Sequence, residues 1–356
     1  MGIKVEIIKD IARQFVIKGE ILSVEPFGAG HVNKTFLVCT DKKKYVLQKI
    51  NTVAFKKPKE LMENIINVTV SLASRGIETM TFIPTREGAH YFKGDDYYRM
   101  YVFVDDVVVY QEIPNKEVFK KAGFAFGEFI NHLKNFDCKE LHETIKDFHN
   151  TPKRFNDFKC SVEKDSVDRV KDCKEEIDFI LEREQTLGLA VEQLKNGTLP
   201  TRVTHNDTKL NNILIEEKTL QPRMVIDLDT VMPGSLIYDF GDAIRFGAST
   251  ANEDEKDLSK VHFDMQMFSA FAEGFCAPLK NTMTDKEWEL LPYGAYLMTI
   301  ECGMRFLSDY LDGDVYFSTA YDNHNLVRAR TQLKLAKEMQ ENLDKMGEII
   351  NQLKNR

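Results

Sequence analysis

The segment Thr204–Asn212, with sequence THNDTKLNN, holds a carboxylate and a carboxamide in one loop. Asp207 stands five residues before Asn212, and the apolar run Ile213–Ile215 follows directly. A loop that transfers a phosphoryl group needs this arrangement, because the Asp accepts the proton of the attacking hydroxyl while the Asn ligates a magnesium ion on the nucleotide phosphates. An Asn-rich turn that caps a strand is the plainer alternative, and the full spaced set favours the catalytic one.

A second acidic position follows about twenty residues later, where the apolar run Val225–Ile226 ends in Asp227. A β-hairpin from Ile213 to Ile226, turning through Glu216–Pro222, would return Asp227 to the neighbourhood of Asn212. Mg²⁺ prefers oxygen ligands and keeps several waters, so these two side chains would suffice to hold it. A strand that simply ends in an acidic turn is the alternative.

Two further segments add to this set. Gly28 and Gly30 lie between two predicted strands and would let backbone N–H groups approach a phosphate, although two glycines in such a place are also common in a plain turn. Asp239 follows a proline-glycine turn, and we expect it to cap a helix or to hold the catalytic loop through backbone N–H groups.

The N-terminal hundred residues that must support these segments are rich in predicted strands. The helix expected between them covers Lys59–Ser74, with Pro58 as a start signal and Gly76 as a stop. The expected strands are Ile21–Pro26, Lys34–Cys39, Lys44–Ile50, Ile77–Pro84 and Tyr97–Val104.

From Pro114 the pattern becomes helical. Asn115 is a plausible N-cap for a helix whose apolar stripe runs from Val118 to Leu133. Residues 137–197 favour charged helix, and residues 256–356 favour helix that ends in a long Lys/Glu-rich segment. The order is therefore a small strand-rich N-lobe, a hinge strand and a mainly helical C-lobe with a hairpin at its centre.

Composition narrows the classes of protein. The 356 residues are 43% hydrophobic and 29% charged, as in ordinary globular proteins with room for two domains. The net charge of −8 and the lack of basic runs disfavour nucleic acid as a partner. Six scattered cysteines without a CxxC pair, and no apolar stretch of membrane-spanning length, predict a cytoplasmic protein with reduced thiols and no membrane partner.

These motifs resemble the aminoglycoside phosphotransferase family, which shares the protein-kinase-like fold, and within it the N-acetylhexosamine 1-kinases most closely. The resemblance spans nearly the whole chain. The strings that carry it are Tyr45–Asn51, Glu60–Asn64, Ile226–Gly234 and Arg305–Phe317.

The resemblance implies an α+β, bilobal fold with an N-lobe over residues 1–104 and a C-lobe over residues 105–356. It implies ATP and Mg²⁺ as cofactors, Asp207 as the catalytic base, and Asn212 and Asp227 as metal ligands. The residues expected at the nucleotide are Gly28, Gly30, His31, Lys49, Tyr101, Val102, Phe103 and Val104. The residues expected at the substrate are Asp229, Arg305 and Tyr316.

One position departs from the protein-kinase pattern, in which a third-strand Lys holds the phosphates and pairs with a helix Glu. Here either Gln48 or Lys49 could occupy it, and the two face opposite sides of a strand. The helix partners Glu60 and Glu63 inherit the same ambiguity.

The expected reaction is transfer of the ATP γ-phosphoryl group to the anomeric hydroxyl of an N-acetylhexosamine such as N-acetylglucosamine or N-acetylgalactosamine. Two alternatives stay open: another hydroxyl acceptor (choline, homoserine, methylthioribose or an aminoglycoside), and a pseudokinase that binds ligands without turnover. The sequence does not choose the hexosamine, the nucleotide base (ATP or GTP) or the oligomeric state.

Overall fold

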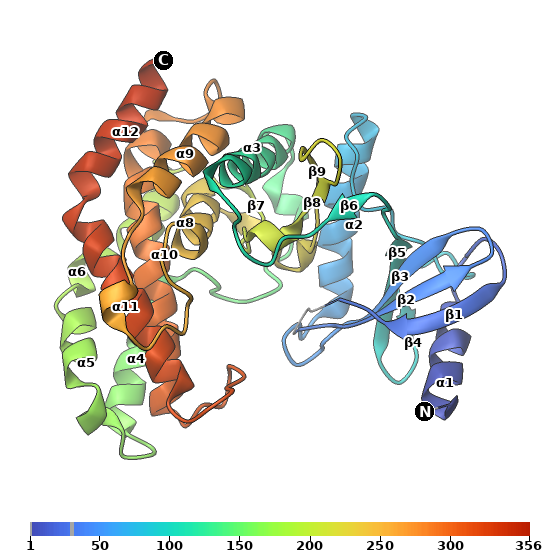
Figure 1. The fold of residues 1–356 in the computed structure, drawn as a ribbon, viewed down its shortest axis with the longest axis horizontal. Helices are drawn as coiled ribbons and strands as arrows, with labels where there is room; N and C mark the ends of the chain where they lie inside the picture. The colour runs from blue at the N-terminus through green and yellow to red at the C-terminus, as the bar shows by residue number, and fades with distance from the viewer. Residues whose placement is uncertain (1, 29–31) are drawn as a thin grey trace. The chain divides into compact units, whose positions relative to one another are not determined.

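The computed structural model describes residues 2–28 and 32–356, in two compact units. Figure 1 labels the elements. The first unit comprises Met1–Val108, Asn135–Lys146 and Leu214–Met232, and the second comprises Val109–Lys134, Asp147–Ile213 and Pro233–Arg356. None of the helices in the described ranges is both long and apolar enough to span a bilayer.

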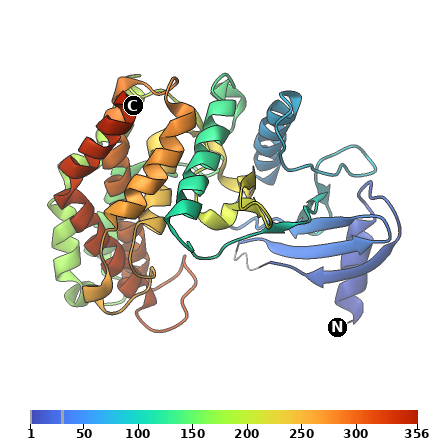
Figure 2. The same ribbon diagram turned by 45° about the horizontal axis from the view of Figure 1, so that its top comes forward.

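The first unit is built on an antiparallel sheet in the order β1-β2-β3-β5-β4. Helix α1 covers one face of this sheet (Figure 2). The elements are α1 (Gly2–Ala12), β1 (Ile21–Pro26), β2 (Lys34–Thr40), β3 (Lys44–Lys49), α2 (Pro58–Ser74), β4 (Phe92–Lys93), β5 (Tyr97–Val102) and β6 (Val107–Val108).

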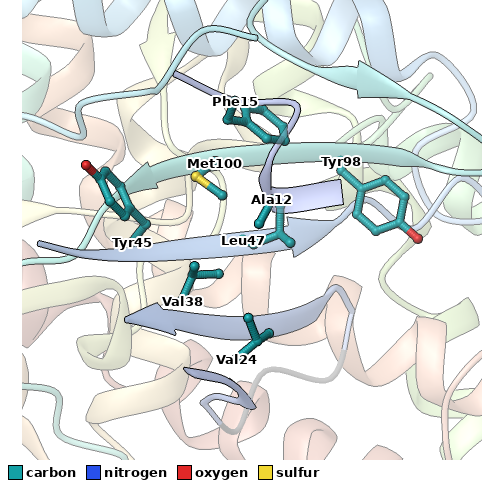
Figure 3. Packing of buried hydrophobic residues seen from close by; sticks show 8 residues of the cluster. All are labelled: Ala12, Phe15, Val24, Val38, Tyr45, Leu47, Tyr98 and Met100. Carbon is teal, nitrogen blue, oxygen red and sulfur yellow. The ribbon is translucent and has the colours of Figure 1, made fainter. Parts of the chain in front are cut away.

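Alternation along the strands separates two faces of the sheet. Tyr45 and Leu47 of β3 lie in the apolar core with Met100 of β5, and Ala12 and Phe15 cover them (Figure 3). The other face of β3 and β5 carries Gln48 and Arg99, which are register partners. The sheet therefore buries an apolar face against α1 and leaves a polar pair on its opposite side.

The strand expected over Ile77–Pro84 is wrong. The segment forms an isolated antiparallel bridge between Phe82 and Tyr101, made by the backbone bonds from Ile83 N to Met100 O and from Val102 N to Thr81 O. The next residue, Pro84, bonds elsewhere, since its carbonyl accepts from Val16 N at 2.9 Å. The segment therefore borders β5 without becoming a regular strand.

The hairpin expected between Ile213 and Ile226 is confirmed as β8 (Ile213–Glu216) and β9 (Pro222–Val225), which join β6 in a second sheet. Leu220 sits in the turn with a positive φ of 52°. The segment after β9 forms a short 3₁₀ turn, Leu228–Thr230. Asn212 thus directly precedes the first hairpin strand, and Asp227 follows the second.

The second unit is mainly helical. The expected cap is confirmed, because the side chain of Asn115 accepts a hydrogen bond from Val118 N at the start of α3. The Lys/Glu-rich C-terminal segment is helical as expected, but it forms two helices, α11 and α12, with an interruption at Asn342. The helices are α3 (Lys116–His132), α4 (Thr151–Lys164), α5 (Lys174–Leu181), α6 (Glu184–Leu187), α7 (Leu189–Lys195), α8 (Leu236–Gly247), α9 (Met265–Leu279), α10 (Asp285–Leu311), α11 (His324–Glu341) and α12 (Leu343–Asn355). The short strands β7 (Arg202–Thr204) and β10 (Met232–Gly234) pair with each other.

Candidate active site

The loop after β7 holds the predicted base in a defined orientation. Asn212 Nδ2 donates to Asp207 Oδ2 at 3.0 Å and to the Asp207 carbonyl at 2.8 Å. Lys209 Nζ lies 2.9 Å from Asp207 Oδ1, and the Asp207 carboxylate raises the pKa of Lys209. The Asp207 side chain keeps 31% of its surface exposed, so its carboxylate is both oriented and reachable.

The buried carboxylate of Asp239, in the first turn of α8, holds the backbone of this loop. It accepts hydrogen bonds from His205 N at 2.8 Å and from Asn206 N at 2.7 Å. The Asp239 carbonyl accepts a further bond from Thr208 Oγ1 at 2.6 Å. The expectation that Asp239 holds the loop of Asp207 through backbone N–H groups is confirmed. Burial raises the pKa of Asp239 to about 6.

A second carboxylate one turn along α8 completes the support. Asp242 accepts from Thr208 N at 3.0 Å and pairs with Arg245 through two bonds of 3.1 and 3.0 Å. Sequence reasoning missed Asp242 and Lys209. Their signals were present, because Asp242 lies three residues after Asp239 and therefore on the same helix face, and Lys209 lies two residues after Asp207.

In the first unit, Asp227 follows the second hairpin strand, and its backbone lies in the left-handed region, with φ of 58° and ψ of 57°. The predicted substrate residue Asp229 is buried. Asn33 Nδ2 donates to its Oδ2 at 2.6 Å, and Arg99 forms a very short ion pair with its Oδ1. Both carboxylate oxygens of Asp229 are therefore occupied by residues of its own unit.

Gln48 and Lys49, the two candidates for the third-strand position, lie on opposite faces of β3. Gln48 accepts from Arg99 Nε at 2.9 Å and donates to Thr35 Oγ1 at 3.1 Å. Lys49 lies on the opposite face and pairs with Asp96 at 2.5 Å. It is Gln48 that shares a hydrogen-bond network with Asp229, whereas Lys49 does not join the other predicted residues.

The helix acids considered as partners of a third-strand Lys have other contacts. Glu60 pairs with Lys57 at 3.0 Å, and Glu63 lies 2.7 Å from His142 Nε2. Within the described residues, no ion pair therefore joins α2 to β3. Sequence reasoning missed Arg99, because nothing in its local context marks a strand Arg as the partner of a carboxylate 130 residues away.

The nucleotide-binding expectations fall on two segments of the first unit. Gly28 has φ of +78°, which favours glycine, whereas Gly30 and His31 lie outside the described residues. The ring of Phe27 contacts the ring of Phe103 edge-on at 5.7 Å, so the start of the glycine loop meets the strand end expected to receive the base. Tyr101 and Val102 belong to β5, and Phe103 and Val104 follow it.

Arg305 and Tyr316, both expected at the substrate, line one pocket of the second unit. The cavity measures about 160 Å³, and Arg154, Asp157 and Asp312 also border it. The Arg305 guanidinium lies 5.5 Å from the Phe317 ring and 6.0 Å from the Tyr316 ring. It has no hydrogen bond or ion pair with any described residue, so its donors stay available to a ligand.

The wall of this pocket that carries Tyr316 is tied to Asp309, a buried residue of α10. Asp309 accepts hydrogen bonds from the backbone N–H groups of Val315, Tyr316 and Phe317 at 2.9, 2.7 and 2.9 Å, and from Asn325 Nδ2 at 2.8 Å. One carboxylate thus orders the loop, while the Tyr316 side chain remains 70% exposed. Sequence reasoning missed this role of Asp309.

The fold and the loop geometry define a class of protein. Residues 23–265 match the profile of the phosphotransferase enzyme family (APH), which is more than half of the 356 residues. The chain belongs to this family, and the resemblance to aminoglycoside phosphotransferases is confirmed. It is a small-molecule phosphotransferase.

Solved structures agree on the fold. The microcompartment-associated aminopropanol kinase has 15% identity and a TM-score of 0.68, with 96% of this chain and 98% of that one covered. An aminoglycoside phosphotransferase from Alicyclobacillus acidocaldarius has 13% identity and a TM-score of 0.62, with 97% and 96% covered. Spectinomycin phosphotransferase, bound to ADP and spectinomycin, has 14% identity and a TM-score of 0.53, with 92% and 98% covered. The expected α+β kinase-like fold is confirmed.

Proposed function

We propose that this phosphotransferase moves the γ-phosphoryl group of ATP to the anomeric hydroxyl of an N-acetylhexosamine and releases the sugar 1-phosphate and ADP in the cytoplasm. The observation that carries the proposal is the small pocket where Arg305, with unpaired donors, meets the exposed ring of Tyr316. These are two of the three residues that the resemblance assigns to the substrate, the third being Asp229.

Asp207 is proposed to take the proton of the attacking hydroxyl. Its carboxylate is reachable and oriented by Lys209 and Asn212, as a general base requires. Phosphoryl transfer asks little covalent chemistry of the protein, so positioning of the hydroxyl and charge stabilisation carry most of the rate enhancement.

Asn212 and Asp227 are proposed to hold Mg²⁺, and the donor set fits this ion. Asn212 uses Nδ2 to bind Asp207, and its Oδ1 accepts no hydrogen bond from a described residue, which leaves a hard oxygen for a cation. Asp227 would supply a carboxylate oxygen. The ion would neutralise the charge that builds up on the phosphoryl oxygens during transfer.

The nucleotide is proposed to bind through the first unit. The backbone around Gly28, Gly30 and His31 would approach the phosphates, and adenine would bond to backbone groups between Tyr101 and Val104. The contact between Phe27 and Phe103 supports a shared role for the two segments, because it joins them within one unit.

The acceptor pocket favours one small ring over a large antibiotic. Its volume of about 160 Å³ lies below the range of about 300–1,000 Å³ that is common for drug-sized ligands. Arg305 would donate to the acetamido carbonyl or to a ring hydroxyl, and Tyr316 would stack on the sugar ring.

One observation favours a second candidate, an amino-alcohol acceptor. Asp157 and Asp312 border the same pocket and could receive an ammonium group. Arg154 and Arg305 oppose that assignment, because two cations beside the pocket would repel a third.

An acceptor panel tests the proposal. The protein, with ATP and Mg²⁺, would be given N-acetylglucosamine, N-acetylgalactosamine, glucose, ethanolamine and an aminopropanol, with ADP release as the rate and phosphorus NMR to identify the product. We expect 1-phosphates of the N-acetylated sugars. Asp207→Asn should lower the rate by about 10²–10⁴-fold and leave ADP binding unchanged. A higher kcat/KM for an amino alcohol would replace the proposal with the second candidate.

A further inference from the structure

A buried polar network lies on the side of the first unit's sheet opposite α1. Arg99 of β5 binds Gln48 through Nε and Asp229 through Nη1, and Asn33 occupies the other oxygen of Asp229. Asn33 Oδ1 in turn accepts from Asn51 N at 3.0 Å. Arg99 is one of the largest fully buried side chains of the chain. The guanidinium therefore ties two strands to the segment that follows β9.

The same segment has a second buried anchor two residues further on. Asn64 of α2 donates from Nδ2 to the Val231 carbonyl at 3.0 Å and to the His142 carbonyl at 2.8 Å. Its Oδ1 accepts from His142 N at 2.8 Å. Both polar atoms of this buried amide are thus used: one bond joins α2 to the segment at Val231, and two join it to the backbone of His142.

Between β9 and these anchors lies Asp227. Its backbone is in the left-handed region, which non-glycine residues adopt only when their surroundings enforce it. Burial lowers the pKa of the Arg99 guanidinium, but the Asp229 carboxylate and, with smaller effects, Tyr101 and Asp227 raise it above its usual value. Arg99 thus binds Asp229, two residues after Asp227, and its charge also interacts with the Asp227 carboxylate, the proposed metal ligand.

We propose that Arg99 is the positioning residue of the metal site: its fork to Gln48 and Asp229, with Asn64 at Val231, holds the Asp227 carboxylate in the orientation that binds Mg²⁺. This inference rests on the proposed role of Asp227. It assigns Asp229 to the support of the site and not to the substrate. It also explains the neutral Gln48, because the third strand here supplies an acceptor for a fifth-strand Arg.

Lysine could not replace Arg99 in this role. A guanidinium presents donors in a rigid plane and reaches Gln48 and Asp229 at the same time, whereas an ammonium is a point charge on a flexible stem. Arg99→Lys therefore keeps the charge opposite Asp229 and removes the fork, which separates positioning from charge.

The test measures ADP binding by calorimetry across a range of Mg²⁺ concentrations, without any acceptor. For Arg99→Lys we expect the Mg²⁺ concentration that gives half of its maximal effect on ADP binding to rise at least tenfold. ADP binding without Mg²⁺ should stay unchanged. The matched control is Arg223→Gln, which removes an exposed Arg–Glu pair with Glu78 from β9 of the same unit and should leave the Mg²⁺ dependence as in the wild type.

The outcomes are distinct. An unchanged Mg²⁺ dependence in Arg99→Lys overturns the inference. Asp227→Asn reports separately on the proposed function: if it also keeps the wild-type Mg²⁺ dependence, the metal assignment itself fails. Should Arg99→Lys not fold, the double variant Arg99→Met with Asp229→Asn removes both buried charges together. We expect the same tenfold rise from it, and wild-type behaviour would again overturn the inference.

Discussion

At the scale of single residues, protonation of the buried carboxylate of Asp239 affects the loop that carries Asp207, the proposed base. Burial raises the pKa of Asp239 to about 6, so the group is ionised at pH 7 and accepts from His205 N and Asn206 N. A raised pKa means that the folded protein binds the proton more tightly than the unfolded chain. The contribution of Asp239 to the free energy of unfolding is therefore full below about pH 4 and is lost as the pH rises through 6.

Activity should depend on the ionisation of Asp239 in the opposite direction: kcat should fall as the pH drops, whereas the stability contribution of Asp239 rises. Protonation below pH 6 replaces one acceptor with a donor, so one backbone N–H of the loop loses its partner and kcat should fall. A pH profile of kcat for the wild type should show this acidic limb near pH 6. Asp239→Asn has a single acceptor oxygen at every pH, so its kcat should be reduced about tenfold or more and should lack the limb. An identical limb in the variant would assign it to another group.

At the scale of elements, the loop between α10 and α11 owes its order to Asp309. Three consecutive backbone N–H groups and Asn325 donate to this carboxylate. Asp309→Asn places an amide donor against these donors, and buried donors without partners cost about 1–3 kcal/mol each.

The loop carries Tyr316, so Asp309→Asn should raise the KM for the acceptor by about tenfold and leave the KM for ATP unchanged. Steady-state kinetics with each substrate varied in turn would measure this. Asp285→Asn is the matched control, since it makes the same change in α10 at a side chain that is 94% exposed. Equal increases in both KM values would contradict a local role for the loop.

Some elements could be predicted from the sequence and others could not. The hairpin at 213–226 and the cap at Asn115 follow from local signals, namely apolar runs, a turn and a capping side chain. The segment 77–84 has the composition of a strand, but its pairing was decided by contacts with β5, which local sequence does not encode. The break at Asn342 likewise interrupts a charge pattern that continues on both sides.

Packing between α3 and α9, which run side by side in Figures 1 and 2, depends on glycine. A Cβ on Gly274 of α9 would collide with the backbone carbonyl of Lys120 in α3, and backbone cannot move aside cheaply. Gly274→Ala should lower the free energy of unfolding by about 1–3 kcal/mol.

Gly347→Ala in α12 is the control, because a Cβ there meets no atom within 4 Å. It should stabilise the protein by up to about 1 kcal/mol through helix propensity. Urea unfolding of both variants measures the difference, and equal effects at the two sites would contradict the packing argument.

At the scale of the whole molecule, the three residues proposed for phosphoryl transfer, Asp207, Asn212 and Asp227, lie on either side of one hairpin in the sequence. These three residues could be predicted from the sequence, because their spacing around the hairpin is itself a motif. The roles of Arg99, Asn64 and Asp309 could not be predicted from the sequence, since each residue acts through partners that come near only in the folded chain.

Ligand-linked stability of the intact chain separates the roles of the two aspartates. A ligand that binds only the folded protein stabilises it by about 2.7 kcal/mol at a hundred times its Kd. At about 2–4 °C per kcal/mol for domains of this size, Mg²⁺ with ADP should raise Tm by roughly 5–10 °C. Chelation by EDTA should remove the metal-dependent part of that shift. Asp207→Asn should retain the shift, because a general base is not a metal ligand, whereas Asp227→Asn should lose the metal-dependent part. Loss of the shift in Asp207→Asn alone would mean that the two assignments are exchanged.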